Sequence, residues 1–159
     1  MVSHSMNMIR LIHALVGFSL VVIFASSTVA GPVEDASEVI DRWAEAITAN
    51  DINAVVKLYT PDALLHGISS PKLYAGSESI REYFKTSPEI ANKVTITERH
   101  MIILAEAAVM GIGFYQFDLF QEGIRAPRMA RFTFVMVKRG NDWLITHHHS
   151  SMLPPAPLQ

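Results

Sequence analysis

The spacing of apolar residues changes about halfway along the chain. Up to residue 85 they recur at every third or fourth position, which is the period of an amphipathic helix. This pattern predicts three helices, over residues 33–49, 52–59 and 77–85. The pair Asn50-Asp51 breaks the first helix and caps the second, which must end before Pro61. Residues 63–66 have the composition of a short strand.

From residue 94 onward the apolar period is two, which is typical of strands with one buried face. The pattern predicts four strands, over residues 93–104, 107–120, 130–139 and 143–151. Short turn sequences join them, so we expect successive antiparallel hairpins rather than βαβ units. Gly111 and Gly113 predict strong curvature or a bulge. Three helices followed by a curved meander predict an α+β fold, with the helices on one face of a bent, cone-shaped sheet.

The last predicted strand, WLITHHHSS, carries three consecutive histidines. Strict alternation places His147 and His149 on the face of Trp143, and His148 on the opposite face with Ser150. One face should meet the core or a pocket, and the other should meet solvent or a partner subunit. A single bulge would exchange the two faces, so the pattern alone does not decide which face is which.

The first thirty residues have the pattern of a secretory signal. An apolar run over 11–25 is followed by small residues, with Thr28 and Ala30 at the positions that a signal peptidase reads. We expect cleavage after Ala30, which leaves a mature domain over 31–159 in the bacterial periplasm or outside the cell. No stable membrane association is expected after cleavage, although an uncleaved N-terminal anchor is the rival interpretation. The chain contains no cysteine, so packing rather than disulfides must hold an exported domain together.

Composition excludes one class of partner. The 159 residues carry a formal net charge of −2 and show no cluster of basic residues interleaved with aromatic ones. Nucleic-acid binding requires such a basic face, so we expect no nucleic-acid partner.

Three segments of the chain carry a resemblance to a known family. RWAEAITANDINAVVKLYTPDA, GSESIREYF and RFTFVMVKRGNDWLITHHHSS are similar to the nuclear transport factor 2-like superfamily, including its SnoaL-like proteins. Within it, the chain most resembles stand-alone bacterial relatives of the association (hub) domain of calcium/calmodulin-dependent protein kinase II. The resemblance covers about residues 33–155 and implies a cystatin-like cone of strongly curved antiparallel sheet on three N-terminal helices. Members include isomerases, dehydratases, transport factors and assembly domains, so the fold does not specify the function.

The resemblance also implies roles for particular residues. Trp143, His147 and His149 match the tryptophan and the H-x-H motif of the hub. Arginines line the hub's pocket, whereas this chain has Phe114, Phe134 and Ser150 at those positions. The same register predicts a mainly apolar ligand pocket with a polar mouth. The predicted pocket residues are Tyr59, Phe114, Gln116, Phe134, His148 and Ser150.

His148 is the candidate catalytic residue, because a desolvated imidazole in such a pocket can act as a general acid or base. Metal binding is the other role considered for the histidines, with His147 and His149 as ligands and His66 or His100 as further candidates. No HExxH motif, no cysteine and no fixed third ligand accompany them, so we expect no metal site and hydrogen bonding at a strand end or subunit interface instead. Some proteins of this kind are named oxidoreductases, but no GxGxxG fingerprint is present and we expect no cofactor.

The opposite face of the sheet favours assembly. Arg131, Thr133 and Val135 should lie there, on a face apolar enough to be covered by another subunit. We therefore expect a homodimer or a larger ring. The leading hypothesis is an exported oligomeric domain for assembly or for binding a small apolar ligand, without established catalysis. The alternative is a small lyase- or isomerase-type enzyme that uses the pocket histidine as general acid or base.

Overall fold

A computed structural model describes residues 31–87, 93–121 and 124–154 of the chain. The predicted signal segment, residues 1–30, lies outside the described residues. Three described helices are α1 (Pro32–Thr48), α2 (Ile52–Lys57) and α3 (Gly76–Thr86). None of these described helices is long and apolar enough to cross a membrane.

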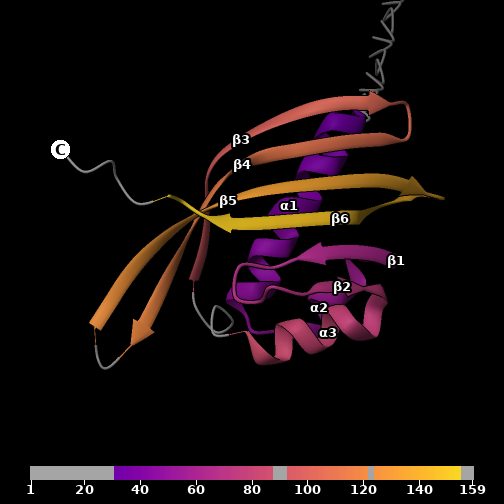
Figure 1. The fold of residues 1–159 in the computed structure, drawn as a ribbon. Coiled ribbons are helices and arrows are strands. Elements are labelled where there is room, and N and C mark those ends of the chain that lie inside the picture. The colour runs from indigo at the N-terminus through magenta and orange to yellow at the C-terminus, as the bar shows by residue number, and fades with distance from the viewer. Residues whose placement is uncertain (1–30, 88–92, 122–123, 155–159) are drawn as a thin grey trace, which may run out of the picture.

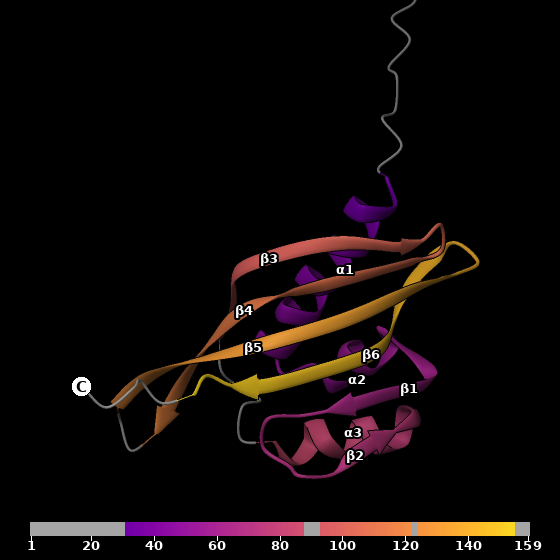
Figure 2. The same ribbon diagram turned by 45° about the horizontal axis from the view of Figure 1, so that its top comes forward.

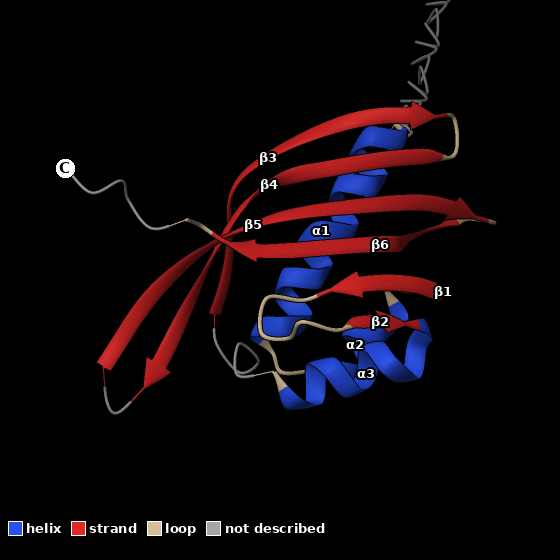
Figure 3. Ribbon diagram, in the orientation of Figure 1, coloured by secondary structure: helices blue, strands red, loops and turns tan. Residues whose placement is uncertain are grey.

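In the described part of the chain, six strands form one sheet in the order β2-β1-β6-β5-β4-β3. Their bounds are β1 (Tyr59–His66), β2 (Leu73–Ala75), β3 (Lys93–Ala105), β4 (Ala108–Gln121), β5 (Ile124–Arg139) and β6 (Asp142–Met152). Figures 1 and 3 show the long strands arching over the helices, while the ends of β4 and β5 that approach residues 122–123 bend away as a separate arm. The α+β class and the curved sheet on N-terminal helices are thus confirmed.

The helices cover one face of the sheet, called the inner face below. α1 packs against β3, β4 and β6, and α3 packs against β1 and β2, as the turned view of Figure 2 also shows. The apolar stripe of α1 is buried there, with Val39, Ile40 and Ile47 at most 2% exposed. Asp51 caps α2 as expected, because its carboxylate accepts a hydrogen bond from the Ala54 amide at 2.9 Å.

The pairing of β1 is not among the strand pairings predicted from the sequence. β1 lies parallel to β6, with Tyr59 opposite Ile145 and His66 opposite His149. The second helix is correspondingly shorter than predicted, because Tyr59 belongs to β1. The Ile145 amide donates to the Leu58 carbonyl at 2.8 Å, which joins the end of α2 to the centre of the sheet.

A bulge in β3 changes which side chains of that strand face the helices. The pairing of β3 with β4 shifts between Ile96 and Glu98, so residues before and after Thr97 exchange faces. Arg99 consequently reaches α1, where its guanidinium donates to the Asp41 carboxylate at 2.7 Å. Gly113 allows β3 to approach β4 closely at this bulge, since a Cβ at that position would lie 2.0 Å from the Glu98 carbonyl oxygen.

Candidate functional site

A second bulge, at Thr146, decides which histidine is buried. The pairing of β5 with β6 runs from Met136–Ile145 to Val135–His147 and skips Thr146. Trp143 and Ile145 therefore face inward together with His148, and not together with His147 and His149. The predicted strict alternation along this strand was wrong for that reason.

His148 is the centre of a buried chain of hydrogen bonds, called the inner polar chain. The Trp43 indole nitrogen donates to the Tyr59 hydroxyl at 3.0 Å, and that hydroxyl lies 2.8 Å from His148 Nδ1. On the other side of the ring, His148 Nε2 lies 2.7 Å from the Ser150 hydroxyl, which also bonds the Tyr115 hydroxyl. Four elements, α1, β1, β4 and β6, contribute to this chain.

Aromatic rings enclose the imidazole. Its ring stacks on Phe134 at a centroid distance of 4.1 Å and meets the edge of Trp43 at 5.2 Å. His148 is 2% exposed, and this burial holds its pKa well below the ordinary value. Burial likewise raises the pKa of the Tyr59 hydroxyl. Both groups are therefore neutral near pH 7.

A small cavity adjoins the inner polar chain. Its walls are Trp43, Ile47, Ile68, Tyr83, Phe84, Ser87, Tyr115, Phe117, His148 and Ser150. The cavity measures about 20 Å³, which is room for about one water molecule. A cavity of this volume accommodates no drug-sized molecule.

The structure brings four predicted pocket residues together and separates two from them. Tyr59, Phe134, His148 and Ser150 share the inner face, all at most 6% exposed. Phe114 and Gln116 lie on the other face of β4, which corrects their predicted place. The uninterrupted register between β4 and β5 pairs Phe114 with Arg131, and both point away from the helices. Tyr115 and Phe117 occupy the inner positions instead.

The predicted pocket residues do not include Trp43 and Tyr115, which also belong to the inner polar chain. Trp43 lies in the apolar stripe of α1 and is 2% exposed. Its indole N–H is a donor that seldom stays unpaired when buried. A tryptophan within such a stripe therefore signals an acceptor on the facing element, here Tyr59 at the start of β1.

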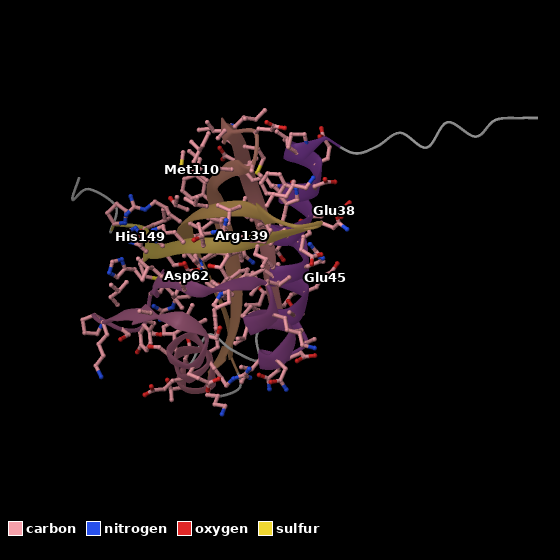
Figure 4. All side chains as sticks on the ribbon, turned by 90° about the vertical axis from the view of Figure 1, so that its right-hand side faces the viewer. Glu38, Glu45, Asp62, Met110, Arg139 and His149 are labelled. Carbon is pink, nitrogen blue, oxygen red and sulfur yellow. The ribbon has the colours of Figure 1, made fainter. Side chains whose placement is uncertain are left out.

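His147 and His149 lie on the outer face, the side of the sheet away from the helices. Figure 4 shows His149 on the opposite side of the sheet from Glu38 and Glu45 of α1. The His149 ring meets that of His66 on β1 at 5.8 Å. Partial burial, and then repulsion from His149 and His66, lowers the pKa of His147. Within residues 31–87, 93–121 and 124–154, no group of three or more His, Asp or Glu side chains is placed to hold a metal ion.

The outer face also contains a broad hollow that crosses β3 to β6. Its lining residues are Glu98, His100, Ile112, Gly113, Phe114, Arg131, Phe132, Thr133, His149 and Ser151, around a volume of about 560 Å³. Charges of both signs lie in it, since Glu98 pairs with His100 at 2.9 Å and Arg131 contributes a guanidinium. This outer hollow is far larger than the inner cavity.

Acid should destabilise the fold from about pH 6.5 downward. Because the pKa of His148 is lowered by folding, the unfolded chain takes up a proton that the folded chain does not. The stability that His148 contributes is complete above the ordinary pKa of 6.5 and is lost as the pH falls below it. The free energy of unfolding should fall by up to about 1.4 kcal/mol per pH unit. Urea unfolding across this range measures the slope.

Two variants, each with one histidine replaced, test whether His148 causes this dependence of the free energy of unfolding on pH. His148→Gln should lose most of the dependence, whereas His149→Gln, on the exposed outer face, should keep it. An equal slope in both variants would contradict the assignment to His148.

Comparison with known proteins now places the chain in a family. Residues 33–154 match the model of the calcium/calmodulin dependent protein kinase II association domain. A Xanthomonas campestris structure assigned to that domain is 30% identical, covers 85% of this chain and 100% of its own, and has a TM-score of 0.72. No curated protein sequence matches the chain significantly.

Other solved structures share the fold. An NTF2-like protein from Shewanella oneidensis is 25% identical, with a TM-score of 0.62 over 76% of this chain and 98% of its own. The hub homology domain from Chlamydomonas reinhardtii is 19% identical, with a TM-score of 0.63 over 75% and 98% of the two chains. The chain belongs to the calcium/calmodulin dependent protein kinase II association domain family, within the NTF2-like proteins of cystatin-like fold.

Proposed function

We propose that this chain is a self-associating domain whose subunits meet through the outer face of the sheet. One observation carries the proposal. The outer face holds half-buried apolar side chains, among them Phe114 and Val135, beside a hollow of about 560 Å³. Apolar surface of this kind on a small domain usually marks an interaction site. Membership of an association-domain family favours a second copy of the chain as the partner.

The charges of the outer face fit a two-fold symmetric interface. In such an interface each patch meets its own copy, so it must carry both members of every charge pair. Glu98 and Arg131 lie in the same hollow, on strands separated by β4. The guanidinium of one subunit can therefore meet the carboxylate of the other, while Thr133 and Val135 supply uncharged contact beside it.

Reversing one of these charges should disrupt the assembly. Arg131→Glu places two carboxylates in each hollow, where the like charges repel each other. We expect native mass spectrometry of the mature domain to change from a defined oligomer to a monomer. Lys85→Glu, an equal reversal at an exposed position of α3, should leave the oligomer intact.

The double variant Glu98→Arg with Arg131→Glu tests the pairing itself. It restores opposite charges and should recover the oligomer. An Arg131→Glu protein with the subunit number of the parent would show that this face is not the interface. The same spectra report any small molecule that the protein retains.

The second candidate function is acid–base chemistry on a small, mainly apolar molecule at His148. The observation that favours it is the contact of a buried imidazole–hydroxyl pair, His148 and Ser150, with the inner cavity. A substrate larger than one water requires the wall formed by Ile68 and Tyr83 to move. Loss of turnover in His148→Ala, with folding intact, is the result that this candidate requires.

A further inference from the structure

The inner polar chain begins at a group that can only donate. The Trp43 indole nitrogen carries one hydrogen and no available lone pair, so the Tyr59 oxygen must accept at the 3.0 Å contact. The direction of this first hydrogen bond is therefore fixed by chemistry alone.

The direction of the second bond follows from burial. The Tyr59 hydroxyl has one hydrogen of its own, and the side chain is 3% exposed. Within the described residues, the acceptor available to that hydrogen is His148 Nδ1 at 2.8 Å. If Nδ1 carried the hydrogen instead, the Tyr59 hydrogen would be buried without an acceptor, which is a costly arrangement. Tyr59 therefore donates to Nδ1.

We infer that Trp43 and Tyr59 hold His148 as the tautomer with its hydrogen on Nε2. On the side of the cavity the imidazole is therefore a hydrogen-bond donor rather than a base. A neutral imidazole has one ring N–H, and Nδ1 is occupied as an acceptor. Nε2 must then donate to the Ser150 oxygen, 2.7 Å away. In this inference Trp43 and Tyr59 are positioning residues, which act through His148.

The inference rests on the second candidate function and narrows it. With its lone pair directed at Tyr59, His148 cannot remove a proton from carbon on the cavity side. Ser150 accepts from His148 and also contacts the Tyr115 hydroxyl. The inner polar chain therefore suits hydrogen-bond donation from Nε2 towards the cavity side. It does not suit proton abstraction by a free imidazole.

Nitrogen NMR of the full domain with ¹⁵N-labelled histidine tests the tautomer directly. The spectrum is recorded at about pH 8, and the variants His147→Gln and His149→Gln assign the signals of these two residues by loss. We expect His148 to show a protonated, pyrrole-type Nε2 and an unprotonated, pyridine-type Nδ1. A protonated Nδ1 in the parent protein overturns the inference.

Tyr59→Phe tests the positioning role. Without the hydroxyl, Nδ1 loses its donor and the Trp43 indole loses its acceptor. We expect the His148 nitrogens to lose their separate tautomer signature and the indole N–H resonance to move upfield. An unchanged His148 signature in folded Tyr59→Phe would exclude Tyr59 as the positioning residue. If that variant does not fold, the parent spectrum and Trp43→Phe decide the question. None of these signals depends on turnover, so the tautomer stands even if His148→Ala shows that no catalysis occurs.

Discussion

His148→Ala should lower the free energy of unfolding by about 3–5 kcal/mol. The change removes a ring stacked on Phe134 at 4.1 Å and opens a void among aromatic side chains. It also leaves the Tyr59 and Ser150 hydroxyls in the core without the imidazole that each of them contacts. Both effects act in the same direction. Denaturant unfolding measures the loss, provided that the free energy of unfolding depends on denaturant concentration with the same slope in both proteins.

A neighbouring residue supplies the control for that prediction. His66→Ala removes the same side chain from an exposed position of the adjacent strand β1, and it should change stability by no more than about 0.5 kcal/mol. Wild-type stability in His148→Ala would mean that the histidine is not part of the core. Turnover on a small substrate that disappears without loss of stability would support the catalytic role instead.

Gly113→Ala should cost about 3 kcal/mol or more, the upper range for overpacking. The added Cβ would lie 2.0 Å from the Glu98 carbonyl oxygen and 2.9 Å from the Arg99 Cα. Both are backbone atoms, which no rotamer change can move aside. Relief requires β3 to separate from β4 at the bulge, and this would also displace Arg99 from Asp41. Thermal and denaturant unfolding measure the effect.

Gly111→Ala is the matched comparison, two residues earlier on the same strand. Its new Cβ would meet the ends of flexible side chains, Ile40 at 2.6 Å and Met101 at 3.1 Å. These can rotate away, so the cost should be about 1 kcal/mol. Equal losses in the two variants would contradict the explanation by backbone contact.

The fold was largely predictable because most of its signals are local. The helix α1 can be recognised from apolar residues that recur with a period of 3.6. The strands from β3 to β6 can be recognised from a period of two and from the turn residues between them. The family resemblance drawn from these segments is confirmed by the match over residues 33–154. Cleavage after Ala30 and export stay predictions.

The error in the faces of β6 has a simple physical cause. A bulge adds one residue to a strand, and one residue exchanges the inward and outward sets of side chains. The bulge at Thr146 carries no distinctive sequence, so strict alternation assigns the faces of β6 wrongly. The parallel partner of β1 was missed for a different reason: it depends on β6, which begins more than seventy residues later in the chain.

The position of β6 within the sheet determines when the core can form during synthesis. β6 is the last of the six described strands to be synthesised, yet it lies between β1 and β5 and joins the two parts of the sheet. Until residue 152 is made, the short β1–β2 hairpin and the β3–β5 meander have no strand to connect them, and Tyr59 has no imidazole to contact. The growing polypeptide therefore cannot complete this core before β6 has been synthesised.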